Sequence, residues 1–171
     1  MPLVRDFRNT SFKKHRIDRC GRYVGSKLYW KLYAIENTLR VVINSVLTQQ
    51  IAANWWSLAV DHRIVSRAGR FRASHAVRPR NASPGVHDIH LTFLSDLTEI
   101  LRANSNLFLP VITDTNSWIA TLEAIRVPRN LVGHMNFPNA FDKAAIDAAY
   151  SRLPSLIGQL ATRGVPILVP R

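Results

Sequence analysis

The sequence predicts an all-helical protein, an antiparallel bundle of four to five helices. Apolar residues recur at three- and four-residue steps over several long segments, and both the alternation typical of strands and internal repeats are missing. The length of 171 residues suits one domain with a core of its own. We expect a basic flexible arm over residues 1–25, a helical domain over 26–163 with a basic surface loop at 72–87, and an apolar tail over 164–171.

The first long helix is expected from Ser26, which suits an N-cap, to about Gln50. The residues that would form its buried face fall at helical spacing: Leu28, Leu32, Ile35, Leu39, Val42, Val46 and Leu47. The residues before it alternate basic side chains with single aromatics and end in Gly21 and Gly25. That pattern favours a mobile arm closed by a turn.

Three further helices are expected after the first long helix. The second covers about 54–70, and the prolines, glycine and arginines of 72–87 after it are typical of a surface loop. The third covers about 88–104, and the fourth begins at the cap-competent residues 113–116. Each presents apolar residues on one face, so all of them can contribute to one core.

Two prolines affect the C-terminal half. Pro128 has no amide proton and disfavours helical angles in the residue before it, so we expect a kink or a helix restart there. The last helix is expected over about 139–160, where Pro154 would bend or split it. The apolar tail after Gly164 is expected to strap across the bundle or to dock on a second chain.

The charge is strongly positive and regional. The formal net charge is +12, and residues 1–90 hold sixteen Lys and Arg against five acids, whereas residues 91–171 hold seven against six. Most of these cations are arginines, whose flat guanidinium suits phosphate. The predicted partner is a polyanion, RNA or DNA ahead of a membrane, and a merely solvated basic surface is the alternative. The candidate RNA-binding residues are Arg63, Arg67, Arg70, Arg72, Arg78 and Arg80.

The compartment follows from what the chain lacks. Cys20 is the only cysteine, so no intrachain disulfide can form, which favours a reducing compartment. The first sixteen residues are polar and basic, without the apolar segment of a signal peptide. The most apolar long stretch, 41–60, is interrupted by polar residues that a bilayer core would penalise. We therefore expect a cytoplasmic protein without a membrane-spanning helix.

The phrase EAIRVPRNLVGHMN contains the residues with the clearest catalytic potential. Arg129 and His134 are separated by four residues, and polar Asn130 directly follows the arginine. Arg70 and His75 have the same spacing, but they lie in a charge-rich stretch, whereas Arg129 follows an amphipathic helix in a segment poor in basic residues. Positions five apart on a helix diverge by about 140°. Two chains that meet across this segment would instead place two Arg/His pairs around one groove.

The segment IRVPRNLVGH, together with YWKLYAIENTLRVVI on the first long helix, resembles the HEPN superfamily. The hallmark of that superfamily is an arginine, usually a polar residue, a few further residues and a histidine, on a late helix of a small helical bundle. Residues of about 26–160 fit its order of helices. The resemblance maps the functional residues to Arg129, Asn130 and His134, with Glu36 in a supporting role.

The resemblance also implies an activity and partners. Active members are metal-independent endoribonucleases that need no cofactor and dimerise so that their two motifs face each other. Many are toxins or antiviral defence effectors, so the expected partners are RNA, a second copy of the chain, and an antitoxin or regulatory protein. Asn136 occupies the position at which toxins paired with nucleotidyltransferase antitoxins have a tyrosine. Silencing by nucleotidylation of such a tyrosine is therefore not expected.

The residue types fit this chemistry. Without a metal, RNA can be cleaved by its own 2′-hydroxyl, which attacks the adjacent phosphate and leaves a cyclic phosphate and a 5′-hydroxyl. Histidine titrates near neutrality and can accept or donate the protons involved. Arginine supplies a fixed cation for the charge that develops on the phosphate. Asn130 could orient the phosphate or the imidazole by hydrogen bonds.

Alternative interpretations stay open at this point. Arg129 could instead cap a helix end or pair with Glu123 or Asp142, and His134 could be an ordinary core or surface histidine. The protein would then be a non-catalytic nucleic-acid- or protein-binding HEPN module in a larger complex, or a structural helical adaptor. Binding of RNA that survives His134→Ala, without cleavage in either form, would indicate the binding module.

Other candidate residues have simpler explanations. His87, Asp88 and His90 resemble a compact ligand cluster, but no second cluster completes a tetrahedral site, so cap and loop roles are favoured and no metal site is predicted. Glu36 and Arg40 form an i, i+4 pair that would support the first long helix.

Overall fold

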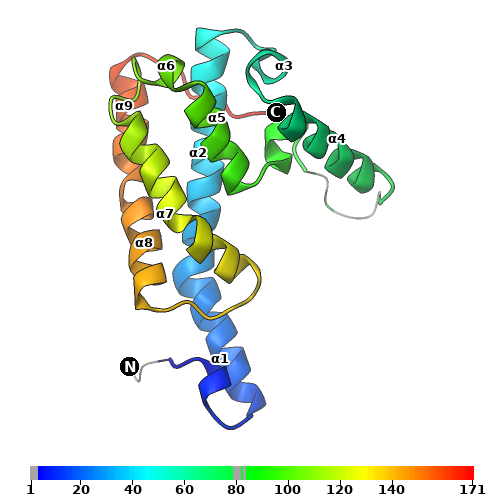
Figure 1. Cartoon of the computed structure of the whole chain (residues 1–171), viewed down its shortest axis with the longest axis vertical. Helices are drawn as coiled ribbons and strands as arrows, with labels where there is room; N and C mark the ends of the chain where they lie inside the picture. The colour runs from blue at the N-terminus through cyan, green and yellow to red at the C-terminus, as the bar shows by residue number, and fades with distance from the viewer. Residues whose placement is uncertain (1–3, 79–81, 83) are drawn as a thin grey trace.

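The computed structural model describes residues 4–78, 82 and 84–171, and these residues form an all-helical structure without a strand. Helix α2 (Trp30–Gln50) lies at the centre, and α5 (Leu94–Ala103), α7 (Thr115–Gly133), α8 (Ala140–Ser151) and α9 (Leu153–Thr162) pack beside it or beside one another (Figure 1). The predicted all-helical class is thus confirmed.

The N-terminal part of the chain differs from its prediction as an arm. After a short 3₁₀ turn at Phe7–Asn9, helix α1 (Lys14–Val24) continues through a π-helical segment at Gly25–Tyr29 directly into α2, and this helix extends beyond the bundle (Figure 1). The predicted flexible arm over 1–25, its closing turn and the Ser26 N-cap are therefore wrong for the described residues. The long helix ends at Gln50, as predicted.

Tertiary contacts explain why the glycines do not break the helix. The Cys20 side chain is buried and its Sγ donates to the Arg5 carbonyl oxygen at 3.2 Å. The ring of Tyr23 stacks on that of Phe137, with centroids 5.7 Å apart. A glycine inside a helix costs only about 1 kcal/mol relative to alanine, and the contacts of Tyr23 with Phe137 and of Val24 with the buried cluster that contains Val132 offset that cost.

The predicted second helix forms two helices. Residues Trp55–Ala59 make the short α3, the chain is extended at Val60, and α4 covers His62–Ala76. Asp61 causes this restart because its carboxylate accepts a hydrogen bond from the Arg63 amide at 2.8 Å, as an N-cap does. Because α4 reaches Ala76, the first part of the predicted loop at 72–87 is helical. Residues 79–81 and 83 of that loop lie outside the described residues.

The third predicted helix begins later than Asp88. Asp88–Leu91 form a 3₁₀ turn, and α5 follows from Leu94, where the Asp96 carboxylate accepts from the Phe93 amide at 2.9 Å. A short α6 (Ser105–Phe108) occupies the start of the connector to α7.

The two prolines have different effects. Helix α7 continues through Pro128 to Gly133, so the helix does not restart there. The predicted last helix is split at Arg152 into α8 and α9, with Pro154 in the first turn of α9, where a missing amide proton is tolerated. Asn139 caps α8 by accepting from the amides of Phe141 and Asp142 at 2.7 and 3.0 Å.

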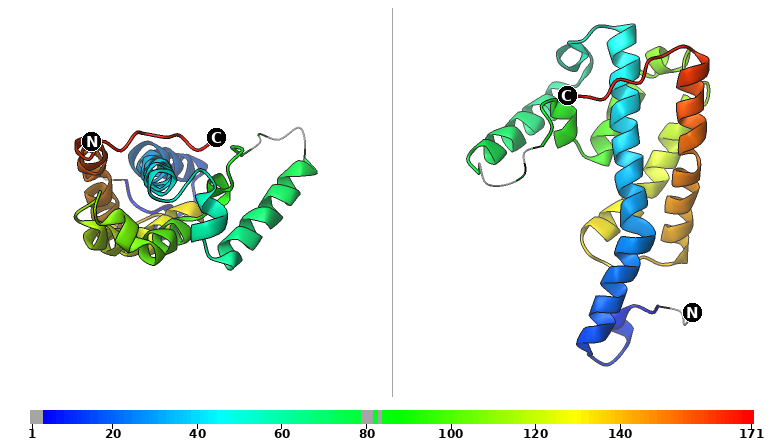
Figure 2. Two further views of the ribbon diagram at one scale, coloured as in Figure 1. Left: turned by 90° about the horizontal axis from the view of Figure 1, so that it is seen from above. Right: turned by 180° about the vertical axis from the view of Figure 1, so that it is seen from behind.

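The tail adopts the first of its two predicted arrangements and straps across α2 (Figure 2). The amide of Leu168 donates to Ser45 Oγ at 2.8 Å, and its carbonyl oxygen accepts from Asn44 Nδ2 at 2.8 Å. Asn44 Oδ1 in turn accepts from Trp55 Nε1 at 3.1 Å. Two of the polar residues that interrupt the apolar 41–60 stretch, Asn44 and Ser45, thus hold the tail, and Asn44 also holds Trp55 of α3. In the described part of the chain no helix combines the length and hydrophobicity needed to cross a membrane.

Candidate functional site

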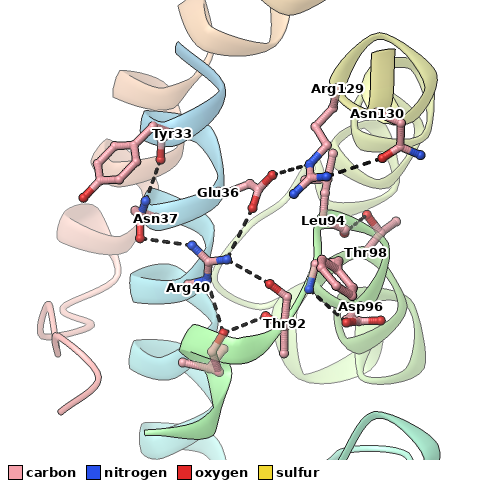
Figure 3. A network of polar contacts seen from close by, with 12 residues as sticks. Tyr33, Glu36, Asn37, Arg40, Thr92, Leu94, Asp96, Thr98, Arg129 and Asn130 are labelled. Atoms are coloured by element: carbon pink, nitrogen blue, oxygen red, sulfur yellow. Dashed lines mark hydrogen bonds and ion pairs between the residues drawn. The ribbon is translucent and has the colours of Figure 1, made fainter. Parts of the chain in front are cut away.

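Arg129 projects from the last turns of α7 toward α2. Its Nε lies 2.7 Å from Glu36 Oε1, and about a quarter of the Arg129 side chain is exposed (Figure 3). The predicted alternative partners are engaged elsewhere, since Glu123 pairs with Arg102 at 2.7 Å and Asp142 bonds the Asn139 amide at 2.9 Å. The resemblance implied a supporting role for Glu36, and in the structure the Glu36 carboxylate is the one that contacts the Arg129 guanidinium.

A second guanidinium lies on the other side of Glu36. Arg40 Nη2 is 3.3 Å from Glu36 Oε2, and the same side chain donates to the carbonyl oxygens of Thr92 and Ile89 at 2.9 and 3.2 Å (Figure 3). Burial lowers the pKa of Arg40, and the nearby charge of Arg129 lowers it further, while Glu36 raises it. An arginine keeps its proton in spite of such shifts. One carboxylate between two guanidiniums leaves one positive charge uncompensated in this cluster.

This cluster forms one wall of a cleft of about 500 Å³, within the range of small-ligand sites. Two exposed tyrosines, Tyr29 and Tyr33, belong to the same cleft. Its lining also includes Leu32, Glu36, Asn37, Arg40, Pro84, Gly85, His90, Arg129, Gly133 and Met135. The cleft is therefore built from the end of the π-helical segment Gly25–Tyr29, α2, the end of α7, η3 (Asp88–Leu91) and the residues just before η3.

His90 is the imidazole that lines the cleft. Its Nε2 lies 2.9 Å from the Pro170 carbonyl oxygen, which can only accept, so Nε2 carries the proton of that bond. A β-carbon at Gly85 would lie 2.2 Å from His90 Cδ2, so only glycine allows the chain to pass this close to the ring. The tail is thereby connected to one end of the cleft.

His134 occupies a different position. It is the exposed C-cap of α7, its amide donates to the Asn130 carbonyl oxygen at 2.9 Å, and neither a hydrogen bond nor an ion pair joins its side chain to Arg129. Gly133 and Met135, on either side of it, do line the cleft. Within one chain, Arg129 and His134 therefore lie at the same end of α7 with separate environments.

Asn130 lies beside Arg129 at the exposed surface. Its Oδ1 accepts from Arg129 Nη1 at 3.5 Å, a long contact that leaves most of the amide available (Figure 3). An amide in this place can bond a phosphate oxygen together with the guanidinium.

The predicted RNA-binding arginines fall into three groups. Arg63 pairs with Asp61 at 3.0 Å, Arg67 pairs with Asp96, and Arg72 pairs with Asp88 at 2.5 Å. Arg70 and Arg78 are exposed and have no ion-pair partner in the part of the chain that the structure describes. Arg80 lies outside the described residues.

The aspartates and histidines near η3 have structural contacts. His87 Nδ1 accepts from the Ile89 amide at 3.1 Å, and the ring stacks on Trp55 with centroids 5.2 Å apart. Burial lowers the pKa of His87, and the charge of His90 lowers it further. No cluster of three or more metal-binding side chains occurs among the described residues. The bond to the Ile89 amide makes His87 the cap of the η3 turn.

Four aromatic or polar residues of the cleft were not predicted as part of this site: Tyr29, Tyr33, Asn37 and His90. The two tyrosines could have been noticed because they are four apart on the first long helix and lie outside its apolar series. The sequence indicates His90 only as a close neighbour of His87 and Asp88, since its place in the cleft depends on the path of the loop and the tail. No family model matches the chain, and neither a curated protein nor a solved structure is found to be similar to it.

Proposed function

We propose that this protein is a metal-independent RNA endonuclease of the HEPN type that acts as a homodimer. The observation that supports this most is the position of Arg129: a carboxylate on α2 holds its guanidinium at a cleft, and His134 is exposed where the same helix ends. A phosphate that contacts Arg129 and Asn130 would be fixed and partly neutralised.

In the proposed reaction the 2′-oxygen of a ribose forms a bond to the adjacent phosphorus, and the bond from phosphorus to the 5′-oxygen breaks. One His134 takes the proton of the 2′-hydroxyl, and the second, from the partner chain, gives a proton to the departing 5′-oxygen. Exposure of His134 at the helix end supports this division, since a second chain can approach it. Positioned acids and bases of this kind contribute about a hundred- to ten-thousandfold in rate.

The activity would suit a cytoplasmic toxin or antiviral effector that an antitoxin or another regulatory protein restrains. The basic first half of the chain would hold the RNA. This extension of the proposal rests on the resemblance of the motif and on the net charge.

The direct test is cleavage of mixed cellular RNA by the purified protein in excess chelator. We expect wild type to leave cyclic-phosphate ends and His134→Ala to lose at least a hundredfold in rate. His75→Ala, at an exposed histidine of α4, is the matched control and should cleave like wild type. Absence of cleavage by wild type, with RNA still bound, would overturn the proposal in favour of a binding module.

Glu36 provides a second test, because it acts through Arg129. Glu36→Gln keeps the shape of the side chain but removes the charge between the two guanidiniums, so we expect slower cleavage. In an Arg129→Ala background the same change should add little, since the residue to be positioned is gone. Glu123→Gln, at an exposed carboxylate of α7 that also pairs with arginine, is the control. Additive effects of Glu36→Gln and Arg129→Ala would contradict a positioning role.

A further inference from the structure

Tyr29 and Tyr33 differ from the other aromatic side chains near them. Trp30 packs edge-on against Tyr150 at 4.8 Å, and Tyr23 stacks on Phe137. Tyr29 and Tyr33 have no ring partner in the described part of the chain, and 52% and 66% of them are exposed. Two large rings about one turn apart, Tyr29 at the end of the π-helical segment and Tyr33 in the first turn of α2, are thus available to a ligand.

These rings lie on the same cleft as the cationic cluster. Tyr29, Tyr33 and Arg129 all line it, and Figure 3 places Tyr33 and Arg129 on opposite sides of Glu36. The cleft thus has an aromatic part and a cationic part. A nucleotide matches this arrangement, because its ribose separates an aromatic base from a charged phosphate. A volume of about 500 Å³ is ample for one nucleotide unit.

We propose that the cleft is a nucleotide subsite in which an unpaired base stacks on Tyr33 and Tyr29 while its phosphate contacts Arg129. This inference rests on the proposed function, whose substrate it narrows to single-stranded RNA or unpaired loops. Bases inside a duplex are already stacked and cannot enter such a cleft without being extruded.

The polar groups of the cleft indicate how the base is selected. Asn37 Oδ1 accepts from Arg40 Nη1 at 3.1 Å, and its Nδ2 donates to the Tyr33 carbonyl oxygen at 2.8 Å. Arg40 is likewise committed to backbone carbonyl oxygens. Each of these polar side chains already has partners on the protein, so we expect stacking rather than recognition of the base edge to dominate selection. A purine offers a larger ring surface for stacking than a pyrimidine does.

The experiment measures binding without cleavage. A short purine-rich single-stranded RNA is titrated with the full chain in the His134→Ala background, and fluorescence anisotropy gives the Kd. Tyr33→Ala should weaken binding by about five- to 150-fold, the range for loss of one base stack, whereas Tyr33→Phe should bind like its parent. Phe141→Ala removes an exposed ring that lies outside the cleft and should leave the Kd unchanged.

A modified probe separates the base from the phosphate. The same oligonucleotide is prepared with one abasic nucleotide at each position in turn, so that backbone charge is kept. At the position that occupies the cleft, the abasic probe should bind the parent weakly, and Tyr33→Ala should bind intact and abasic probes alike. A blunt-ended RNA duplex of equal length, which has no unpaired base, should show no effect of Tyr33→Ala.

Three other results would each contradict one claim made above. Unchanged affinity of Tyr33→Ala for the single strand would overturn the stacking subsite. A change in sedimentation on Tyr33→Ala, with RNA affinity retained, would mean that the tyrosines bind a second copy of the chain instead of a base. Stacking-dependent binding by a wild-type protein that cleaves no RNA would refute the proposed nuclease activity and leave the subsite supported.

Discussion

At the residue scale, Glu36 determines where Arg129 lies. The two are 93 positions apart, and a 2.7 Å contact between a carboxylate that is 12% exposed and a guanidinium that is 26% exposed joins α2 to α7. Partial burial makes this contact stronger than an ion pair in water, because solvent screens it less. A single side chain therefore couples the position of the candidate site to the packing of the bundle.

Met135 has a backbone conformation that disfavours a side chain. Its φ is +60°, and it directly follows the C-cap of α7. The amides of Met135 and Asn136 donate to the carbonyl oxygens of Val132 and Leu131, both at 3.0 Å, which closes the helix end. Glycine usually occupies this position. We expect Met135→Gly to raise the free energy of unfolding by about 0.5–1 kcal/mol, measured by urea denaturation. Met135→Ala keeps the β-carbon and should give no such gain; an equal gain would show that the methionine side chain, not the backbone, is unfavourable.

His87 predicts a pH dependence of stability. Burial holds its folded-state pKa below the ordinary value of 6.5, and its Nδ1 accepts from the Ile89 amide, so protonation would break that cap. The unfolded chain therefore binds a proton near pH 6.5 that the folded chain does not, and stability falls as the pH drops below that value. Denaturation at pH 7.5 and 5.5 should show a smaller acid loss for His87→Asn, which keeps a capping side chain. His75→Asn, at an exposed residue, should behave like wild type, and an acid loss unchanged in His87→Asn would refute this origin.

At the element scale, the continuous helix over 14–50 shows how tertiary contacts outweigh local signals. The sequence of α1 is basic and contains Gly21, and Gly25 follows four residues later, a pattern that is typical of a turn. Both glycines nevertheless lie inside helical segments. The π segment at Gly25–Tyr29 adds a wider turn between α1 and α2, as such segments do. It sets the face that α1 presents to the 132–137 segment.

Gly25→Ala tests this element. The backbone of Gly25 has φ −60° and ψ −52°, and a β-carbon there would have no neighbour within 4 Å. Alanine should therefore stabilise the helix by about 0.5–1 kcal/mol, seen as slower amide hydrogen exchange over residues 14–29. Gly164→Ala is the opposite control, because its φ of +66° disfavours a β-carbon and the change should destabilise the protein. Faster exchange in Gly25→Ala would indicate that this segment is not helical.

At the scale of the whole molecule, the net charge of +12 is unevenly neutralised. Arg63, Arg67 and Arg72 of α4 are paired with acids on neighbouring elements, which attaches α4 to the rest of the fold. Arg70 and Arg78 are not paired in this way among the described residues. The protein thus uses part of its basic surface for its own structure and leaves part available to a polyanion.

We therefore expect unpaired and paired arginines to contribute differently to the salt dependence of RNA affinity. Each phosphate that an arginine neutralises on single-stranded RNA adds about 0.7 to the slope of log affinity against log salt concentration. Arg70→Ala and Arg78→Ala should each flatten that slope by about this amount, measured by anisotropy between 50 and 200 mM salt, the range over which counterion release is pronounced. Arg102→Ala, at an exposed arginine of α5 paired with Glu123, should leave the slope unchanged. A flat slope in wild type would exclude the basic half as the binding surface.

The sequence by itself determined the helical class and the end of the central helix at Gln50, and it indicated a bend or split of the last helix near Pro154, because periodicity and the effect of proline are local properties. It also singled out Arg129, Asn130 and His134 as candidate catalytic residues, Glu36 as a supporting residue and Arg40 as the helix partner of Glu36. The tertiary structure decided that Arg129 pairs with Glu36 rather than Glu123, that Tyr33 and His90 share its cleft, and that α1 is helical. Local propensities differ by about 1 kcal/mol per residue, so contacts between segments distant in sequence outweigh them, and those contacts cannot be seen before the chain is folded.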